Sequence, residues 1–320
     1  MSAPPAPPSS PGPPPSPGPA GRLRLSSEVD RARRDGQPVL ALESTIIAHG
    51  LPRPRNLEVA RELEALARQE GACPATIAVL DGTPCIGLEP DELVRVAEDT
   101  ALRKLGRRDL PMALALGASG ATTVSATAWL AAAAGIRVFA TGGLGGVHRG
   151  FAESLDESAD LGVLACTRIA VVSAGVKSVL DVPATLERLE TLSVAVVGFA
   201  TETFPGFYLH SSGCPLDWTV RTPDEVAEVM RYQDALGIES ALLVANPVPE
   251  AEQLGPQLHD QALAEALAGA QRDGITGQRL TPYLLAALVR ATGGKALEAN
   301  LAAVRGNVRL GARVAVAFGR

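Results

Sequence analysis

A short apolar segment runs directly into a glycine-rich loop in Ile136-Arg137-Val138-Phe139-Ala140-Thr141-Gly142-Gly143-Leu144-Gly145-Gly146-Val147-His148-Arg149-Gly150. The apolar residues predict a buried strand, which places the loop at the end of that strand, where ligands bind. Glycine lets backbone N–H groups approach an anion closely, and His148 and Arg149 add further donors. The loop therefore predicts a site for a phosphorylated small molecule, with a plain tight turn as the alternative.

The loop lacks two common nucleotide-binding motifs. Gly143-Leu144-Gly145 supplies the first two glycines of a dinucleotide fingerprint, but His148 occupies the position of the third. The Gly-Lys-Ser/Thr of a P-loop occurs nowhere in the sequence. Glycine content alone therefore does not identify the ligand.

Bulk composition limits the class of protein. The 320 residues, 46% of them hydrophobic, suffice for one large α/β domain or two smaller ones. A formal net charge of −6 argues against nucleic acid or an anionic membrane as the main partner. No apolar run approaches the roughly 20 residues that span a bilayer, and no signal peptide opens the chain. The four cysteines lack metal-ligand spacing and are interpreted as buried apolar residues of a reduced compartment, so we expect a cytoplasmic protein.

The chain divides into a tail and one domain. Residues 1–21 consist almost entirely of Pro, Ser, Ala and Gly, which predicts a disordered segment. Residues 22–320 alternate apolar runs with helical patterns and predict a single three-layer α/β/α domain around a mostly parallel, mixed sheet. The expected strands are Val39–Leu42, Ala75–Leu80, Met112–Leu116, Ile136–Ala140, Ile169–Ser173, Val194–Phe199 and Ala241–Ala245.

Helices are predicted from apolar spacing and from capping residues. Thr222-Pro223-Asp224-Glu225 is a capping box with proline in the first turn, and Gly237 marks the end of that helix. Further helical patterns cover 56–70, 122–135, 257–273, 281–292 and 295–309.

Two residues at the ends of predicted strands could carry chemistry. Glu43 follows the apolar run Val39–Leu42, where burial suits a general acid or base, although a structural capping carboxylate fits equally well. Lys177 follows another apolar run, and a lysine in apolar surroundings loses its proton more easily, as a Schiff-base amine requires. The alternative for Lys177 is a solvated side chain that opens the next helix.

Acidic and basic groups elsewhere suggest contacts with a metal or a phosphate. Asp156, Ser158 and Asp160 offer alternately spaced oxygen ligands of the kind that Mg²⁺ or Mn²⁺ binds together with water. Solvated surface charge is the alternative. Lys104 and Arg107–Asp109 form a short basic cluster that could bind a phosphate or pair with surface acids.

Several of these segments together resemble the pseudouridine-5′-phosphate glycosidases, also called pseudouridylate synthases. The resemblance covers essentially all of 22–320, in order. It is carried by Glu43-Ser44-Thr45-Ile46-Ile47-Ala48-His49-Gly50, Pro74-Ala75-Thr76-Ile77-Ala78, Arg107-Arg108-Asp109-Leu110-Pro111, Gly120-Ala121-Thr122-Thr123-Val124, the loop from Ala140 to Gly150, Ala245-Asn246-Pro247 and Thr281-Pro282-Tyr283.

The resemblance implies an activity and a set of roles. It implies reversible cleavage of the C–C glycosidic bond of pseudouridine 5′-phosphate to uracil and ribose 5-phosphate, with Mn²⁺ or another divalent cation, in a homotrimer. Glu43 matches the proton donor, Lys177 the nucleophile that forms an imine with the opened ribose, and Asp156 the metal ligand. The substrate contacts that the resemblance implies, or that we expect beside them, are Lys104, Val124, Thr141, Gly142, His148, Ser158, Ala159, Asp160 and Asn300.

Other functions use the same residues. A Schiff-base aldolase or lyase on another sugar phosphate would share the lysine and the loop. A non-catalytic sugar-phosphate-binding protein would use Glu43 and Lys177 structurally. A conventional two-carboxylate glycosidase would pair Glu43 with Asp160 and would not need Lys177.

Overall fold

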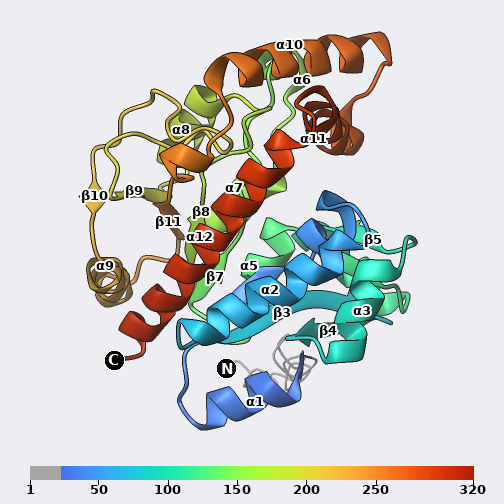
Figure 1. Cartoon of the computed structure of the whole chain (residues 1–320). Coiled ribbons are helices and arrows are strands. Elements are labelled where there is room, and N and C mark those ends of the chain that lie inside the picture. Colours follow the sequence, from blue (N-terminus) through green and yellow to red (C-terminus); the bar gives the residue numbers. More distant parts are fainter. Residues whose placement is uncertain (1–22) are drawn as a thin grey trace, which may run out of the picture.

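The computed structural model describes residues 23–320, except for the side chain of Gln278, as helices packed on both faces of one sheet (Figure 1). The predicted three-layer arrangement is confirmed. The tail predicted to be disordered, residues 1–21, lies outside the described residues. Within them, no helix is long and apolar enough to cross a membrane.

The centre of the sheet is parallel and confirms six of the seven predicted strands. They are β2 (Val39–Glu43), β3 (Cys73–Leu80), β7 (Val138–Ala140), β8 (Ala170–Ser173), β9 (Ala195–Phe199) and β11 (Leu242–Ala245). Their order is β3-β2-β7-β8-β11-β9. The register aligns Leu42 with Ala140, and Ala140 with Val172, so the carboxyl ends of neighbouring strands meet at one edge. In parallel sheets this edge is where ligands bind.

Short strands extend this parallel centre and make the sheet mixed. They are β1 (Arg24–Leu25), β4 (Thr83–Ile86), β5 (Arg103–Leu105), β6 (Gly120–Thr122) and β10 (Thr219–Val220). Both β4 and β6 pair with β3 in antiparallel orientation. Segments of two to four residues carry too little pattern to be predicted from the sequence.

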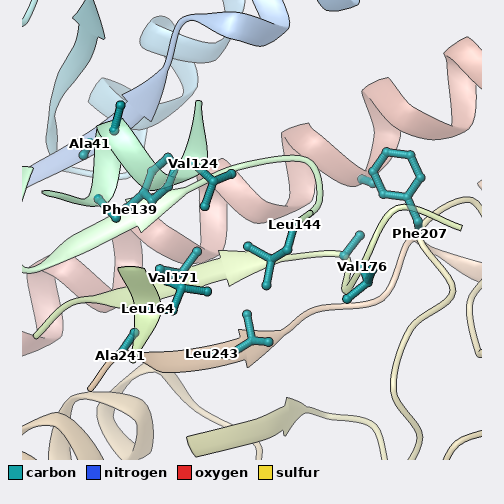
Figure 2. Close-up of a cluster of buried hydrophobic side chains, with 14 of the residues drawn as sticks. Ala41, Val124, Phe139, Leu144, Leu164, Val171, Val176, Phe207, Ala241 and Leu243 are labelled. Carbon is teal, nitrogen blue, oxygen red and sulfur yellow. The ribbon is translucent and has the colours of Figure 1, made fainter. Parts of the chain in front are cut away.

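Alternate residues of the central strands face two separate apolar clusters. Ala41, Phe139 and Val171 point to one face and pack in the same cluster as Leu144 and Val176 (Figure 2). Leu40 and Val138 point to the other face, beneath helices α2 (Arg55–Gln69), α9 (Pro223–Ala235) and α12 (Lys295–Phe318). Burial on both faces explains why these strands are apolar throughout.

The predicted helices are present, with some changes in length. The helices are α1 (Ser27–Arg34), α2 (Arg55–Gln69), α3 (Pro90–Glu98), α4 (Leu110–Ala115), α5 (Val124–Ala133), α6 (Phe151–Ser154), α7 (Ala159–Leu164), α8 (Val182–Thr191), α9 (Pro223–Ala235), α10 (Pro256–Arg272), α11 (Leu280–Ala291) and α12 (Lys295–Phe318). The capping box is confirmed, because Thr222 Oγ1 accepts from Glu225 N at 3.2 Å and Glu225 Oε2 accepts from Thr222 N at 3.1 Å. Helix α12 runs nine residues beyond the predicted end at 309.

The predicted strand Met112–Leu116 is wrong, because this segment belongs to helix α4. Leu110 and Ala113 are buried while Met112 and Leu116 are exposed, which is a helical and not an alternating pattern. Pro111 lies in the first turn, where proline is tolerated. The run was short and wholly apolar, and such runs do not distinguish a strand from a helix.

The cysteine prediction is half right. Cys73 and Cys85 are buried, whereas Cys166 is exposed and Cys214 half-buried; all four are free thiols. Cys166 lies just after α7, where the chain returns to the surface before β8.

Helix α12 crosses the sheet beside α2 and is tied to it by three two-point ion pairs (Figure 1). Arg55 binds Glu298 at 2.6 and 2.9 Å, and Arg305 binds Glu62 at 2.7 and 2.9 Å. Arg313 binds Glu70 at 2.8 and 3.0 Å. The residues that α12 presents to the strand ends are therefore held in register with the sheet.

Candidate active site

A cavity of about 780 Å³ opens at the carboxyl edge of the sheet. The end of β2, the glycine loop after β7, the loop after β8, the start of α5, one face of α11 and the first turns of α12 form its walls. Eleven of the twelve predicted site residues line it: Glu43, Lys104, Val124, Gly142, His148, Asp156, Ser158, Ala159, Asp160, Lys177 and Asn300. The twelfth, Thr141, lies behind the cavity wall.

Glu43 is the last residue of β2 and is 9% exposed. Its carboxylate accepts hydrogen bonds from two hydroxyls, Oε1 from Thr141 and Oε2 from Thr45. A buried carboxylate with both oxygens directed is a fixed group that faces the cavity. This geometry suits proton transfer at a defined position, although it leaves the choice of reaction open.

Thr141 makes a different contact from the one predicted. Its side chain is 2% exposed, and its hydroxyl donates to Glu43 instead of facing the cavity. The residue therefore orients the carboxylate from the neighbouring strand.

Lys177 lies in the loop between β8 and α8 and lines the cavity. Its backbone N donates to Leu144 O at 3.0 Å, and Leu144 N donates to Gly175 O at 2.9 Å, so this loop pairs with the glycine loop. Helix α8 begins only at Val182, which excludes the interpretation of Lys177 as a solvated lysine opening that helix. The side chain is half-buried and shares the cavity with Glu43.

Lys104 extends from β5 into the same cavity and interacts electrostatically with the other charged groups there. Enclosure by the protein lowers the pKa of Lys104, and the positive charge of Lys177 lowers that pKa further. Asp160 and Glu43 act in the opposite direction. Lys104 is open to cavity solvent but lies close enough to Lys177 for the two amines to interact.

The glycine loop is held mainly by its own backbone N–H groups. Those of Thr141, Leu144, Gly145, Val147 and His148 all donate to acceptors within the protein. The prediction that the loop surrounds an anion with backbone donors is therefore wrong for these positions. Gly142 and Gly143 remain as candidates because both line the cavity.

The carboxylate of Asp160 holds two backbone segments of the site in place. Its Oδ1 accepts from Ser125 N and its Oδ2 from Gly145 N, both at 2.9 Å, and the residue is 6% exposed. Both oxygens are thus occupied by backbone, one at the start of α5 and one in the glycine loop. A β-carbon at Gly145 would lie 2.1 Å from Ser158 Oγ, so only glycine fits beneath Asp160 and Ser158.

Asp156 and His148 lie together at another wall. His148 Nδ1 is 4.0 Å from Asp156 Oδ2, and His148 N donates to Asp156 O at 3.0 Å. Burial lowers the pKa of His148, and the attraction of Asp156 offsets this only in part. Among residues 23–320, no group of three or more His, Cys, Asp and Glu side chains is arranged to hold a metal ion.

Some cavity residues were not predicted from the sequence. His49 lines the cavity from a π-helical turn, Ile46–Gly50, directly after Thr45. Burial lowers the pKa of His49, and the charges of Lys104 and Arg53 act in the same direction. The exposed Arg290 of α11 also lines the cavity and adds positive charge there, as does the exposed Arg108 of the predicted basic cluster. His49 lies in a segment that carried the family resemblance, which could have indicated it, whereas no sequence signal pointed to Arg290.

Comparison with known proteins shows the family of this chain. Residues 28–317 match the family model described as Indigoidine synthase A like protein. A pseudouridine-5′-phosphate glycosidase from Streptomyces griseus is 68% identical over 92% of this chain and 91% of its own. The chain belongs to the pseudouridine-5′-phosphate glycosidase family. A second such glycosidase, from Frankia alni, is 57% identical over 93% of this chain and 83% of its own.

Two solved structures share the fold of this family. The prealnumycin C-glycosynthase AlnA in complex with ribulose 5-phosphate has a TM-score of 0.86 at 34% identity, over 93% of this chain and 97% of its own. An indigoidine synthase A-like protein from Thermotoga maritima has a TM-score of 0.85 at 36% identity, over 93% and 98%.

Proposed function

We propose that this protein reversibly cleaves the C–C glycosidic bond of pseudouridine 5′-phosphate, releasing uracil and ribose 5-phosphate. The observation that carries the proposal is the meeting of Glu43, Lys177 and Lys104 in one cavity beside the glycine loop. Family membership supports the reaction, and the ribulose 5-phosphate in the AlnA complex supports a sugar phosphate as ligand.

The chemistry follows from the leaving atom. An ordinary glycosidase protonates a leaving oxygen, whereas here the leaving atom is carbon, which is protonated slowly. Once Lys177 has given up its proton, its nitrogen forms a bond to C1′ as the bond from C1′ to the ring oxygen breaks, and a proton passes from the nitrogen to that oxygen. The nitrogen lone pair then expels the uracil carbon, which also takes a proton, and an imine joins C1′ to Lys177. Water hydrolyses the imine to ribose 5-phosphate.

Glu43 moves the protons in this scheme. Its carboxylate is fixed by two hydroxyls at the cavity wall, so a proton on it is delivered at a defined point. The phosphate supplies binding energy away from the reacting carbon and positions C1′ over the lysine. Further contacts with substrate are assigned to Lys104, His148, Gly142, Val124, Ser158, Ala159, Asp160 and Asn300.

Asp156 would hold a divalent cation such as Mn²⁺. Its carboxylate lines the cavity, and its side chain is 37% exposed, which suits an ion that keeps several waters and takes one protein carboxylate. The bound ion would neutralise phosphate charge. We further propose that the protein is cytoplasmic and forms a homotrimer. Light scattering on the purified protein tests the oligomeric state.

A product assay tests the function directly. Wild-type protein with Mn²⁺ should release uracil from pseudouridine 5′-phosphate, and unphosphorylated pseudouridine should have a far lower kcat/KM. Lys177→Ala should lose activity by about 10³-fold or more. The exposed Lys295, which is not among the cavity residues, provides the matched control, and Lys295→Ala should retain activity. Substantial uracil release by Lys177→Ala would favour a two-carboxylate glycosidase, and wild-type protein that releases none would contradict the proposal.

A further inference from the structure

One face of α12 packs along the glycine loop and the strands beneath it. Asn300 and Val304 lie against Gly142, since a β-carbon there would meet them at 3.1 and 3.0 Å. One turn farther along, Asn307 reaches the same loop, and Gly311 lies against Ala140. The spacing 300, 304, 307, 311 is that of a single helical face. The site therefore depends on the placement of this helix.

We propose that Asn307 is a positioning residue for the reaction, acting through Thr141 on Glu43. Asn307 is fully buried, and its Nδ2 donates to the carbonyl oxygens of Thr141 and Gly142 at 2.7 and 3.3 Å. It thereby fixes the backbone of the residue whose hydroxyl donates to Glu43. The proposal rests on the function proposed above, in which Glu43 transfers protons.

Asn246 determines which way the Asn307 amide faces. Asn246 Nδ2 donates to Asn307 Oδ1 at 2.9 Å, which leaves the Asn307 NH₂ group to the two loop carbonyls. Asn246 is itself placed by its backbone N, which donates to Ser173 O at 2.8 Å at the end of β8. A chain of hydrogen bonds thus runs from the ends of β8 and β11, through α12, to Thr141 and Glu43.

The surroundings of Glu43 explain why its carboxylate depends on this chain of hydrogen bonds. Behind the carboxylate lies a small void with mainly apolar walls, including Leu42, Val304 and Val308. If Thr141 moves away, no other side chain that lines this void carries a hydrogen-bond donor, so one carboxylate oxygen loses its side-chain partner. A displacement of about 1 Å in a catalytic group can cost about 10²-fold in rate. Asn307 should therefore influence the chemical step more than substrate binding.

A double-mutant cycle tests the proposal. Asn307→Ala and Thr141→Val should each lower kcat for uracil release by about 10- to 100-fold, with KM within about threefold of wild type. The double variant should lose no more than Thr141→Val alone, because both changes release the same hydrogen bond. Thr141→Ser, which keeps the hydroxyl, should recover most of the activity. Multiplicative losses in the double variant, or a normal kcat in Asn307→Ala, would overturn the proposal.

Two further measurements separate positioning from general loss of structure. Val314→Ala removes buried volume farther along the same helix and should leave kcat unchanged. Amide hydrogen exchange of peptides covering 140–146 should become faster in Asn307→Ala but not in Val314→Ala. This second measurement needs no substrate: a wild-type protein that cleaves nothing would refute the proposed function, and unchanged exchange at 140–146 would separately refute the role of Asn307.

Discussion

The carboxylate of Glu43 accepts a hydrogen bond from the hydroxyl of Thr141, although the two residues are 98 positions apart in the sequence. They meet because β2 and β7 are neighbours in parallel register, with Leu42 beside Ala140. The sheet itself thus brings an acid from one strand and its hydrogen-bond donor from the next to the edge where the cavity opens.

Removing the acid should stop turnover without unfolding the protein. We expect Glu43→Gln to reduce kcat by about 10²- to 10⁴-fold, since the amide keeps the shape of the carboxylate but cannot supply its proton. Steady-state kinetics and circular dichroism of wild type and variant provide the check. Normal turnover in a folded Glu43→Gln protein would remove Glu43 from the mechanism.

A methyl group at Gly145 should disturb the site. Gly145→Ala would place a carbon 2.1 Å from Ser158 Oγ and 2.8 Å from Asp160 Oδ2, so we expect a loss of about 1–3 kcal/mol in stability and reduced activity. Gly162→Ala is the matched control, because a β-carbon there, in helix α7, meets nothing within 4 Å and alanine favours a helix. Chemical denaturation compares the two, and equal stabilities would contradict the packing described here.

Stability should decline as the pH falls below about 7. Burial lowers the pKa of both His49 and His148 in the folded protein, so below their ordinary value near 6.5 the unfolded chain binds more protons. Their contribution is therefore present above about pH 7 and is lost as the pH falls through the lowered values. Thermal melts between about pH 8 and about pH 5, the range in which histidine titrates, should show a shallower decline in the double variant His49→Asn/His148→Asn. An unchanged slope would exclude these two side chains as the cause.

The ion pairs between α2 and α12 should contribute little compared with the buried face of α12. Arg313→Gln breaks a pair whose arginine side chain is 56% exposed, for which we expect a loss of less than about 1 kcal/mol. Leu301→Ala removes a fully buried side chain from the same helix and should cost about 2–5 kcal/mol. Urea denaturation of both variants measures the difference; a larger loss for Arg313→Gln would contradict this ranking.

Removal of the divalent ion should abolish most activity. A chelator should reduce uracil release, added Mn²⁺ should restore it, and Asp156→Asn should raise the Mn²⁺ concentration needed for half-maximal activity by about 10-fold or more. Glu157→Gln serves as the control, because Glu157 already pairs with Arg188 at 2.9 and 3.0 Å. A metal requirement that is equal in Asp156→Asn and wild type would exclude Asp156 as the ligand.

The sequence predicted the parallel centre of the fold because apolar strands buried on both faces leave a strong pattern, as in Ile169–Ser173. It did not reveal α4, whose short apolar run fits a strand equally well. Strand order brings Glu43 to Thr141, and nothing local in either segment encodes that contact. Asn307 was not predicted for a related reason. Its proposed role depends on hydrogen bonds to backbone carbonyls that are distant in the sequence, and a helical pattern does not show such contacts.

Covalent trapping tests the central claim most directly. The sequence contains three lysines, Lys104, Lys177 and Lys295, so a reduced sugar adduct is readily assigned by peptide mass spectrometry. Incubation of the wild-type protein with ribose 5-phosphate and borohydride should attach the reduced pentose phosphate to Lys177. An adduct confined to Lys104, or no adduct in a protein that releases uracil, would contradict the imine at Lys177.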